Sequence, residues 1–177
     1  MNDKLSLIVP HWPIRPELDA SLKRCVQAID ADEKIIVVND GTGMGKAINK
    51  GLELATGDYL LVSNNDCFHS SGPIRDMCDP HFITVPDSMP GQGVMPRAFY
   101  CMPRWVYELV GGYDEQFQVG YFEDDDMIRR WMNAKVNIRI VRTVHVDHDP
   151  GTTLNNLPNR KEIFENNKAL FEQKWEI

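Results

Sequence analysis

The chain has 177 residues, of which 42% are hydrophobic, and this length and composition suit one well-packed core. Its 26 acidic residues outnumber its 19 lysine and arginine residues, so its charge argues against binding to the phosphate backbone of nucleic acid. It has no run of about 18 apolar residues that would span a bilayer, and its first residues lack the basic stretch and apolar core of a signal peptide. We therefore expect a single domain over residues 1–177, located in the cytoplasm.

The four cysteines are scattered along the chain and form no C-x-x-C pair. They are Cys25, Cys67, Cys78 and Cys101. This spacing favours reduced, buried thiols over a zinc site or a disulfide framework.

Two apolar runs in the first third of the chain predict buried parallel strands. Leu5–Val9 is stopped by Pro10, and Lys34–Val38 is stopped by a polar turn that contains Gly41. Between the two runs, apolar residues recur at helical spacing, namely Leu18, Leu22, Val26 and Ile29. This part of the chain therefore predicts a strand, helix, strand unit.

A second helix is predicted from about Lys46 to Ala55. Gly57 is expected to end it in the left-handed conformation that glycine adopts readily. Tyr59–Val62 is the third predicted strand. The stretch from Asp66 to about residue 92 is then rich in Pro, Gly, Asp and His, and its only strand candidate is Ile83–Val85.

The second half of the chain resumes the alternation of strands and helices. Ala98–Met102 predicts a strand and Arg104–Val110 a helix, and a further helix is expected at about Asp124–Asn133. The strand Val136–Val141 follows, and a polar tail over residues 158–177 is compatible with a helix.

This pattern predicts an α/β fold, with a mostly parallel, Rossmann-like sheet flanked by helices in one compact domain. Ligands of such sheets bind beyond the carboxyl ends of the strands, where Pro10, Asp40 and residues 64–66 would converge.

The first candidate site is Asn64-Asn65-Asp66, which directly follows a predicted strand. Its carboxylate and amide oxygens suit Mg²⁺ or Mn²⁺, and such an ion neutralises charge on a departing diphosphate. The alternative is a loop in which these residues only cap turns.

The second candidate is the run of four acids from Glu123 to Asp126 at a predicted helix start. The helix dipole and an i,i+4 ion pair between Asp126 and Arg130 account for the later acids. They do not account for Glu123 and Asp124, which follow two aromatic residues. A carboxylate that is half-buried there would have its pKa tuned so that it could act as a general base.

The third candidate is the histidine and aspartate segment from His145 to Asp149, expected in a loop after a strand. A histidine there would complete the shell of an ion and favour Mn²⁺ over Mg²⁺, because imidazole is a softer ligand than Mg²⁺ prefers. The alternative is an ordinary polar loop, which we favour for His145. His11, His69 and His81 are expected to do no more than form hydrogen bonds.

The glycine-rich segment from Asp40 to Lys46 matches neither the dinucleotide fingerprint nor the P-loop, since Lys46 and Ala47 stand where those patterns need Gly and Ser or Thr. Two interpretations remain for Lys46: contact with a phosphate, or simple solvation.

Taken in chain order, these segments resemble the inverting family 2 glycosyltransferases of the GT-A fold, particularly their rhamnosyltransferase-like branch. The matching pieces are Pro10-His11-Trp12, the acidic turn at Asp40, the helix positions Ala47, Asn49 and Gly51, Asn64-Asn65-Asp66, the turn Gly111–Glu115, Glu123-Asp124, and His148 five residues ahead of Thr153. The resemblance implies a nucleotide-binding half over about residues 1–66, an acceptor-binding half over about 93–155, and a C-terminal helical tail.

The resemblance also implies the roles of individual residues. The implied donor-binding residues are Pro10, Trp12 and Asp40 at the nucleoside and Asn64 and Asn65 at the ribose and diphosphate. Asp66 and His148 would hold a divalent cation, Mn²⁺ rather than Mg²⁺. Asp124 would deprotonate the acceptor hydroxyl, and Glu123 would help to place a sugar. The donor would carry UDP, GDP or dTDP, and the acceptor would be a glycan, a lipid-linked sugar or a protein.

Two departures from the family pattern bear on this interpretation. Asn64 stands where many relatives have Asp, which removes one anionic ligand and should weaken ion binding. The segment from Asp66 to Ala98 is also short. Two alternatives therefore stay open: a metal-dependent phosphate-ester hydrolase, for which no two-metal signature is present, and a non-catalytic module that binds nucleotide sugars.

Overall fold

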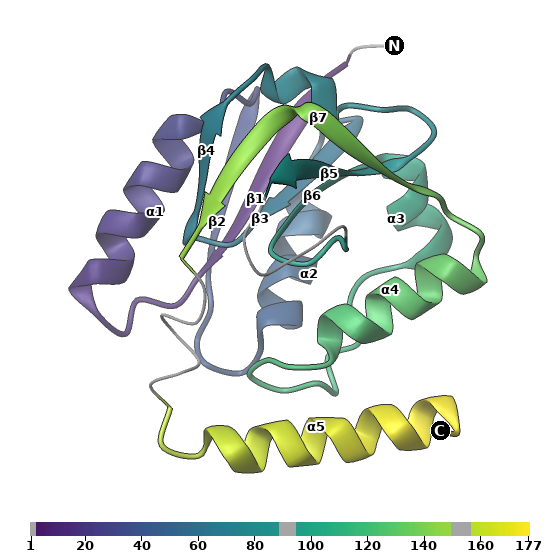
Figure 1. Cartoon of the computed structure of the whole chain (residues 1–177). Helices are drawn as coiled ribbons and strands as arrows, with labels where there is room; N and C mark the ends of the chain where they lie inside the picture. Colours follow the sequence, from purple (N-terminus) through teal and green to yellow (C-terminus); the bar gives the residue numbers. More distant parts are fainter. Residues whose placement is uncertain (1–2, 89–94, 150–156) are drawn as a thin grey trace.

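The computed structural model describes residues 3–88, 95–149 and 157–177, and its centre is one seven-stranded sheet (Figure 1). The strand order is β2-β1-β3-β6-β5-β7-β4. The strands are β1 Leu5–His11, β2 Glu33–Val38, β3 Tyr59–Ser63, β4 Cys67–Ser71, β5 Ile83–Ser88, β6 Phe99–Pro103 and β7 Ile138–His148. Their pairings make β2, β1, β3, β5 and β7 run in one direction and β6 and β4 in the other. The predicted mostly parallel α/β sheet is confirmed.

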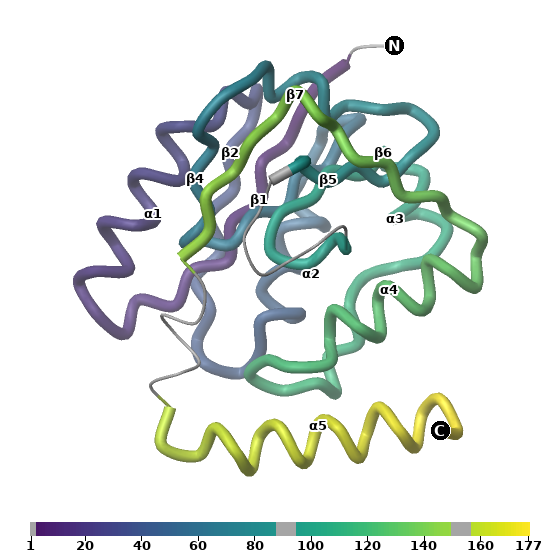
Figure 2. The backbone as a smooth tube through the Cα atoms, in the orientation of Figure 1, coloured from purple at the N-terminus to yellow at the C-terminus, as the bar shows by residue number. Residues whose placement is uncertain are grey.

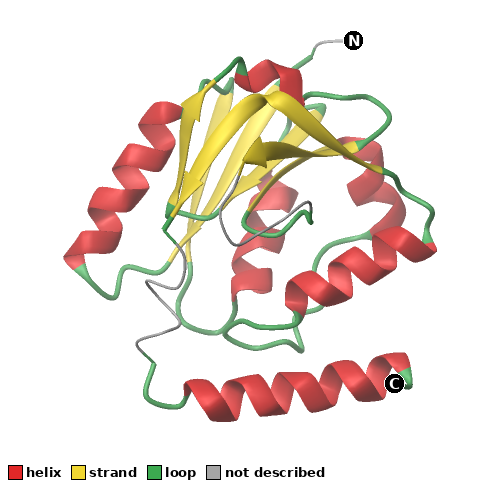
Figure 3. Cartoon of the chain, viewed as in Figure 1, coloured by secondary structure: helices red, strands yellow, loops and turns green. Residues whose placement is uncertain are grey.

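Helices cover the sheet on both faces (Figure 3). They are α1 Pro16–Ala28, α2 Met44–Leu54, α3 Arg104–Val110, α4 Glu123–Asn133 and α5 Arg160–Trp175, with a short 3-10 helix, η1, at Ile74–Met77. The predicted bounds of α3 match the structure, and those of α2 and α4 differ by one or two residues. None of the helices among the described residues is long and apolar enough to cross a membrane.

Side chains of β1 alternate between two hydrophobic cores, as the two-residue period of a strand requires. Leu5 and Leu7 lie in one core with Cys25 of α1, and Ile8 lies in the other with Ile48 of α2. The first core also holds residues of β4 and β7, because the sheet curls until these strands pass in front of β1 and β3 (Figure 2). β1 is therefore buried along its whole length.

The strand β1 continues through Pro10, although the sequence predicted that it stops there. Its pairing with β3 ends at Ile8, so Pro10 lies beyond the part of β1 that has a neighbour on both sides. A proline without an N–H is tolerated in such a position.

The prediction that Lys34–Val38 is a buried strand is only partly right, because β2 forms the edge of the sheet. Val37 is 5% exposed and faces α2, whereas Ile36 and Val38 are 46% and 65% exposed. The reason is that α1 packs mainly on β4 and β1 and leaves the outer face of β2 uncovered.

Gly57 does not end α2 in a left-handed conformation, which corrects the prediction. The helix ends at Leu54, and Gly57 instead lies against β1, where its N–H donates to the Ser6 hydroxyl at 2.8 Å. An added β-carbon would come within 2.7 Å of the Lys4 carbonyl. The site needs glycine for close approach, not for its dihedral freedom.

Two strand segments were absent from the prediction. The chain turns after Asp66 directly into β4, and β7 runs to His148 although the sequence placed His145–His148 in a loop. Val144 and Val146 of this extension are buried in the first core, and His145 between them is half-buried. Their alternation with polar residues is the signal of a strand.

The four cysteines are free thiols, as predicted. Cys25, Cys67 and Cys101 are buried, and Cys78 is half-buried.

Candidate active site

The turn after β3 and the end of β7 bring Asp66 and His148 together. His148 pairs with Cys67 in the β4–β7 ladder, and the N–H of Asp149 donates to the carbonyl of Asp66 at 3.1 Å. These backbone contacts hold the imidazole Nε2 of His148 at 3.4 Å from Oδ1 of Asp66. Both side chains are about nine-tenths buried. The sequence left His145 and His148 as alternatives, and it is His148 that lies beside Asp66.

This pair has the donor set of a site for a divalent cation. The ligand atoms of Asp66, Cys67 and His148 lie within 4.8 Å of one another. Nδ1 of His148 is buried and has no hydrogen-bond partner within residues 3–88, 95–149 and 157–177. Burial raises the pKa of Cys67 well above its ordinary value, so this group stays a neutral thiol and a poor ligand. The carboxylate and the imidazole remain, and together they suit a divalent cation.

The two asparagines before Asp66 are held by backbone and side-chain contacts. The N–H of Asn64 donates to the carbonyl of Ala98 at 2.8 Å. The side-chain amide of Asn65 lies 2.9 Å from Nδ1 of His11, and Nε2 of His11 lies 2.8 Å from the carboxylate of Asp19. Since the amide nitrogen of Asn65 can only donate, His11 accepts at Nδ1 and donates at Nε2. His11 therefore orients Asn65, within the hydrogen-bonding role expected from the sequence.

A second group of acids lies at the start of α4. Glu123 is only 6% exposed, and its Oε2 has no hydrogen-bond partner among the described residues. Asp124 is half-buried and accepts a hydrogen bond of 3.4 Å from the hydroxyl of Tyr113, which in turn lies 2.8 Å from the hydroxyl of Tyr100. The carboxylate of Asp124 thus ends a short chain of hydroxyl groups.

Burial changes the acidity of both carboxyl groups. It raises the pKa of Glu123 to about 8, and the neighbouring charge of Asp124 adds to the rise. It also raises the pKa of Asp124 to about 6, against the opposing effect of the Arg97 guanidinium. At neutral pH this arrangement favours an ionised Asp124 beside a protonated Glu123, which titrate as a pair.

The other two acids of α4 have structural partners, as the sequence indicated. Asp125 pairs with Arg97 at 2.5 Å, and the buried Asp126 pairs with Arg130 at 3.0 Å. Asp126 also accepts from Lys174 and from the indole of Trp175 on α5.

One short segment links the two groups of acids. The carbonyl of Ala98 accepts the hydrogen bond from Asn64, and the adjacent Arg97 makes the ion pair with Asp125. The turn that holds Asp66 and the first turn of α4 therefore contact the same two residues. Sequence reasoning gave Arg97 no role, because nothing in its local sequence marks it.

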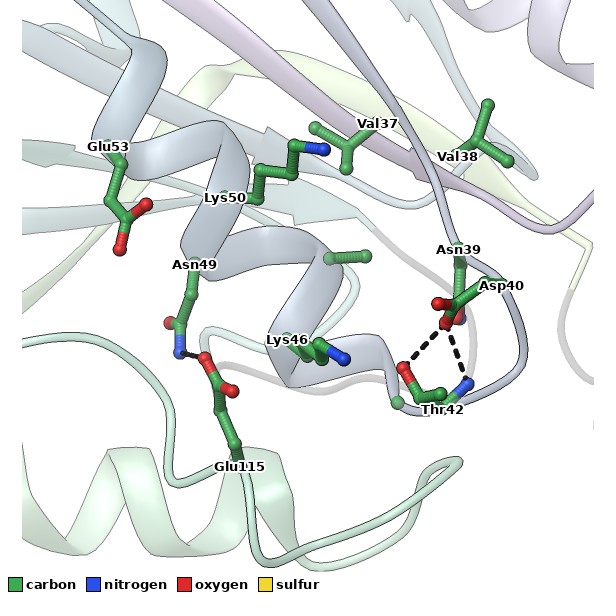
Figure 4. A pocket seen from close by; sticks show the side chains of 12 residues that line it. Val37, Val38, Asn39, Asp40, Thr42, Lys46, Asn49, Lys50, Glu53 and Glu115 are labelled. Atoms are coloured by element: carbon green, nitrogen blue, oxygen red, sulfur yellow. Dashed lines mark hydrogen bonds between the residues drawn. The ribbon is translucent and has the colours of Figure 1, made fainter.

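The remaining predicted donor residues fall into two sets. Asp40 and Lys46 line a cavity of about 330 Å³ between β2, the turn after it and α2 (Figure 4). Asp40 accepts hydrogen bonds from the hydroxyl and the N–H of Thr42, and these lower its pKa. Pro10 and Trp12 are not among the residues described as lining this cavity, and neither are Asn64, Asn65 and Asp66. A β-carbon on Gly41 would lie 2.9 Å from the indole of Trp12, so this ring packs on the turn beside Asp40.

Comparison with known proteins gives one family match. Residues 17–81 match the family model described as glycosyl transferase family 2, and this confirms the predicted family resemblance. The matched segment runs from α1 into the stretch before β5, so it includes Asp40 and Asn64-Asn65-Asp66 but not α4. The rhamnosyltransferase-like branch stays a prediction. None of the curated proteins matches the chain.

Solved structures of glycosyltransferases share the fold at low sequence identity, which confirms the predicted GT-A architecture. One is GalNAc-T7 with UDP, GalNAc and Mn²⁺, with a TM-score of 0.67 and 12% identity over 96% of this chain and 50% of that one. A second is Drosophila β1,4-galactosyltransferase 7 with xylobiose, with a TM-score of 0.57 and 18% identity over 90% of this chain and 78% of that one. A third is the mannosyltransferase PcManGT from Pyrobaculum calidifontis with GDP-Man and Mn²⁺. It has a TM-score of 0.58 and 17% identity over 85% of this chain and 58% of that one. The chain thus spans half of the first structure and less than two thirds of the third.

Proposed function

We propose that this chain is a single-domain glycosyltransferase that moves a sugar from a nucleoside-diphosphate donor onto an acceptor hydroxyl with inversion at the anomeric carbon. The observation that carries the proposal is that the turn holding Asp66 and the first turn of α4 contact the same segment, Arg97–Ala98, through Asn64 and Asp125. The turn carries the buried pair of Asp66 and His148, and the start of α4 carries Glu123 and Asp124. The family match over residues 17–81 and the GT-A fold support it.

Asp66 and His148 would hold a divalent cation on the donor side, and we propose Mn²⁺ because imidazole is one of the two ligands. Such a cation supplies positive charge to the departing diphosphate. The structures of GalNAc-T7 and PcManGT, which contain Mn²⁺ with UDP or with GDP-Man, support this assignment. Asn65, oriented by His11, would direct its amide to the ribose or diphosphate.

The nucleoside would lie against Pro10, Trp12 and Asp40. Trp12 packs on Gly41, so the indole lies against the turn that begins at Asp40. Lys46 lines the cavity beside Asp40 and would contact phosphate from there. UDP, GDP and dTDP are all compatible with these groups.

Asp124 would act as the general base on the acceptor side. Its pKa of about 6 leaves it ionised at neutral pH and still basic enough to accept a proton, and the Tyr113 hydroxyl fixes its direction. The acceptor hydroxyl gives its proton to Asp124 while its oxygen forms a bond to the anomeric carbon. The bond from that carbon to the diphosphate oxygen breaks on the opposite side, and the nucleoside diphosphate leaves with the electron pair. One such in-line step inverts the anomeric carbon.

Glu123 would remain protonated during this step, because its pKa is raised to about 8. A protonated carboxyl group donates a hydrogen bond, so Glu123 would place a sugar hydroxyl next to the base. The acceptor would be a glycan, a lipid-linked sugar or a protein. The proposal includes the cytoplasmic location that the sequence leads us to expect.

A panel of nucleotide sugars tests the function. The purified chain is incubated with UDP-, GDP- and dTDP-sugars, with and without Mn²⁺, and nucleotide release and the melting temperature are measured. We expect at least one donor to raise the melting temperature in a Mn²⁺-dependent way and to be hydrolysed or transferred. A donor that binds without any transfer would indicate a binding module, and release of inorganic phosphate from simple phosphate esters would indicate a hydrolase.

A further inference from the structure

The segment that leads into α4 has an unusual backbone. Val119, Tyr121 and Phe122 have φ angles of 67°, 74° and 69°, and none of them is glycine. Residues with a β-carbon rarely adopt this left-handed region, so three of them within four positions need contacts elsewhere that hold them. The segment ends at Phe122, which caps α4, and Glu123 and Asp124 come directly after it.

Asn167 on α5 supplies such contacts. Its side-chain nitrogen lies 3.0 Å from the carbonyl of Gln118, 2.7 Å from that of Gly120 and 3.1 Å from that of Tyr121. One amide group therefore serves three acceptors in the segment 118–121. Asn167 is 6% exposed and is the buried residue of a helix whose other side chains are exposed or half-buried. Burial of a polar side chain is favourable only when it is hydrogen-bonded, as it is here.

The aromatic rings on either side of Asn167 contact the same segment. Phe164 and Phe171 lie three residues before and four residues after Asn167, so all three share one face of the helix. Their ring centroids lie 5.2 Å and 5.5 Å from that of Phe122, and Phe164 also lies 5.5 Å from Tyr121. The left-handed segment is therefore held against α5 by both ring contacts and hydrogen bonds.

We propose that Asn167 is a positioning residue, which fixes the segment 118–122 and through it the carboxyl groups of Glu123 and Asp124. The catalytic part of this inference rests on the proposed function. Asn167 touches neither carboxyl group. It acts because the first turn of α4 can start at Glu123 only while the residues before it keep their left-handed angles.

The burial of Glu123 supports the proposal. Its Oε2 has no hydrogen-bond partner among the described residues, so no contact of that oxygen holds it inside. If the segment relaxed, the first turn of α4 would fray and Glu123 would move toward water. The charged and titratable groups that face the carboxyl pair are Arg97, Asp125, Tyr113 and Tyr100.

Two measurements on Asn167→Ala test this, with Asn166→Ala as a matched control. Asn166 is the exposed neighbour on the same helix, so the control makes the same change without loss of the three hydrogen bonds. The first measurement is a titration of the side-chain carboxyl carbons of Glu123 and Asp124 by ¹³C NMR, which needs no activity. We expect both midpoints to move toward ordinary carboxyl values in Asn167→Ala and to stay unchanged in Asn166→Ala, because the carboxyl groups gain water.

The second measurement is the pH profile of kcat and kcat/KM for a donor that the wild type uses. Misplacement of the base by about 1 Å costs up to about 100-fold, so we expect a decrease in kcat of about 10- to 100-fold. The donor KM should rise by less than kcat falls, since the segment meets the donor cavity only through the backbone of Val119, which bonds to Thr42 and Met44. The acidic limb of the profile should move in the same direction as the NMR midpoints.

The outcomes separate this inference from the proposed function. Unchanged midpoints in folded Asn167→Ala would overturn the positioning role, whether or not the chain transfers sugar. Shifted midpoints in a chain that uses no donor would support the positioning role and count against the transferase. If Asn167→Ala does not fold, Asn167→Ser retains one donor and should give a smaller shift in the same direction, and an unchanged titration of that variant would overturn the role equally.

Discussion

The carboxylate of Asp66 lies 3.4 Å from the imidazole of His148, although 82 positions (148 − 66) separate them in the chain. The contact follows from strand pairing, because Cys67 and His148 stand opposite each other in the antiparallel ladder of β4 and β7. A ladder fixes both backbones before any ligand arrives, so the two candidate ligands are already oriented.

Loss of either side chain should therefore weaken the response to Mn²⁺. We expect His148→Ala and Asp66→Asn to weaken Mn²⁺ binding by at least about tenfold, since outer-shell partners of a metal site alone are worth that much. The measurement is the Mn²⁺-dependent rise in melting temperature with and without UDP. His81→Ala, an exposed histidine, is the control and should behave as wild type. If His145→Ala lost the response and His148→Ala kept it, our choice between the two histidines would be wrong.

The second prediction concerns Asp124, which accepts the hydrogen bond from Tyr113. Asp124→Asn keeps the shape of the side chain but removes its basicity. We expect kcat to fall by about two to four powers of ten, the usual worth of a general base, while the donor still raises the melting temperature. Glu108→Gln makes the same chemical change on an exposed acid of α3 and should leave the rate unchanged. Full activity of Asp124→Asn would remove this residue from the mechanism.

The pH profile of the transfer reaction should be bell-shaped. Activity should rise as Asp124 loses its proton, at about pH 6, and should fall as Glu123 loses its proton, at about pH 8. Glu123→Gln cannot ionise, so the alkaline limb should disappear in this variant while the acidic limb remains. The check is kcat/KM from pH 5 to 9 with one donor at fixed Mn²⁺. An alkaline limb that persists in Glu123→Gln would assign it to another group.

Much of the fold follows from local patterns in the sequence. Apolar runs such as Leu5–Val9 and the helical spacing of Leu18 and Leu22 predict β1 and α1, because a continuous apolar strand buries both of its faces and an amphipathic helix buries one. β4 was not predicted, because its five residues include Ser and His and are partly exposed. It forms a strand through its pairing with β7, which the local sequence does not show.

The residues of the site likewise fall into those that the sequence predicts and those that it does not. Asp66 stands out because it follows a buried strand, and Glu123-Asp124 stand out because they begin a helix. Arg97 and Asn167 do not stand out, since their partners Asp125 and Gln118 lie 28 and 49 positions away. Contacts over such distances depend on how helices dock, and a single sequence does not show that.

The last prediction concerns stability and again uses Glu123. A carboxyl group whose pKa is raised by burial binds its proton more tightly in the folded state than in the unfolded state. Its contribution to stability is therefore complete below the unfolded pKa, near 4.5, and is lost as the pH rises toward about 8. Glu123→Gln removes this loss, so we expect the variant to be about 1 to 3 kcal/mol more stable than wild type at pH 9 and nearly equal to it at pH 4.

Urea denaturation at the two pH values measures this difference. Glu108→Gln should show no such pH-dependent gain, because Glu108 is exposed. A wild-type chain that is as stable as Glu123→Gln at pH 9 would mean that the Glu123 carboxylate is already solvated or paired in the folded state. That result would contradict the raised pKa of Glu123 and its proposed role as a protonated hydrogen-bond donor next to Asp124.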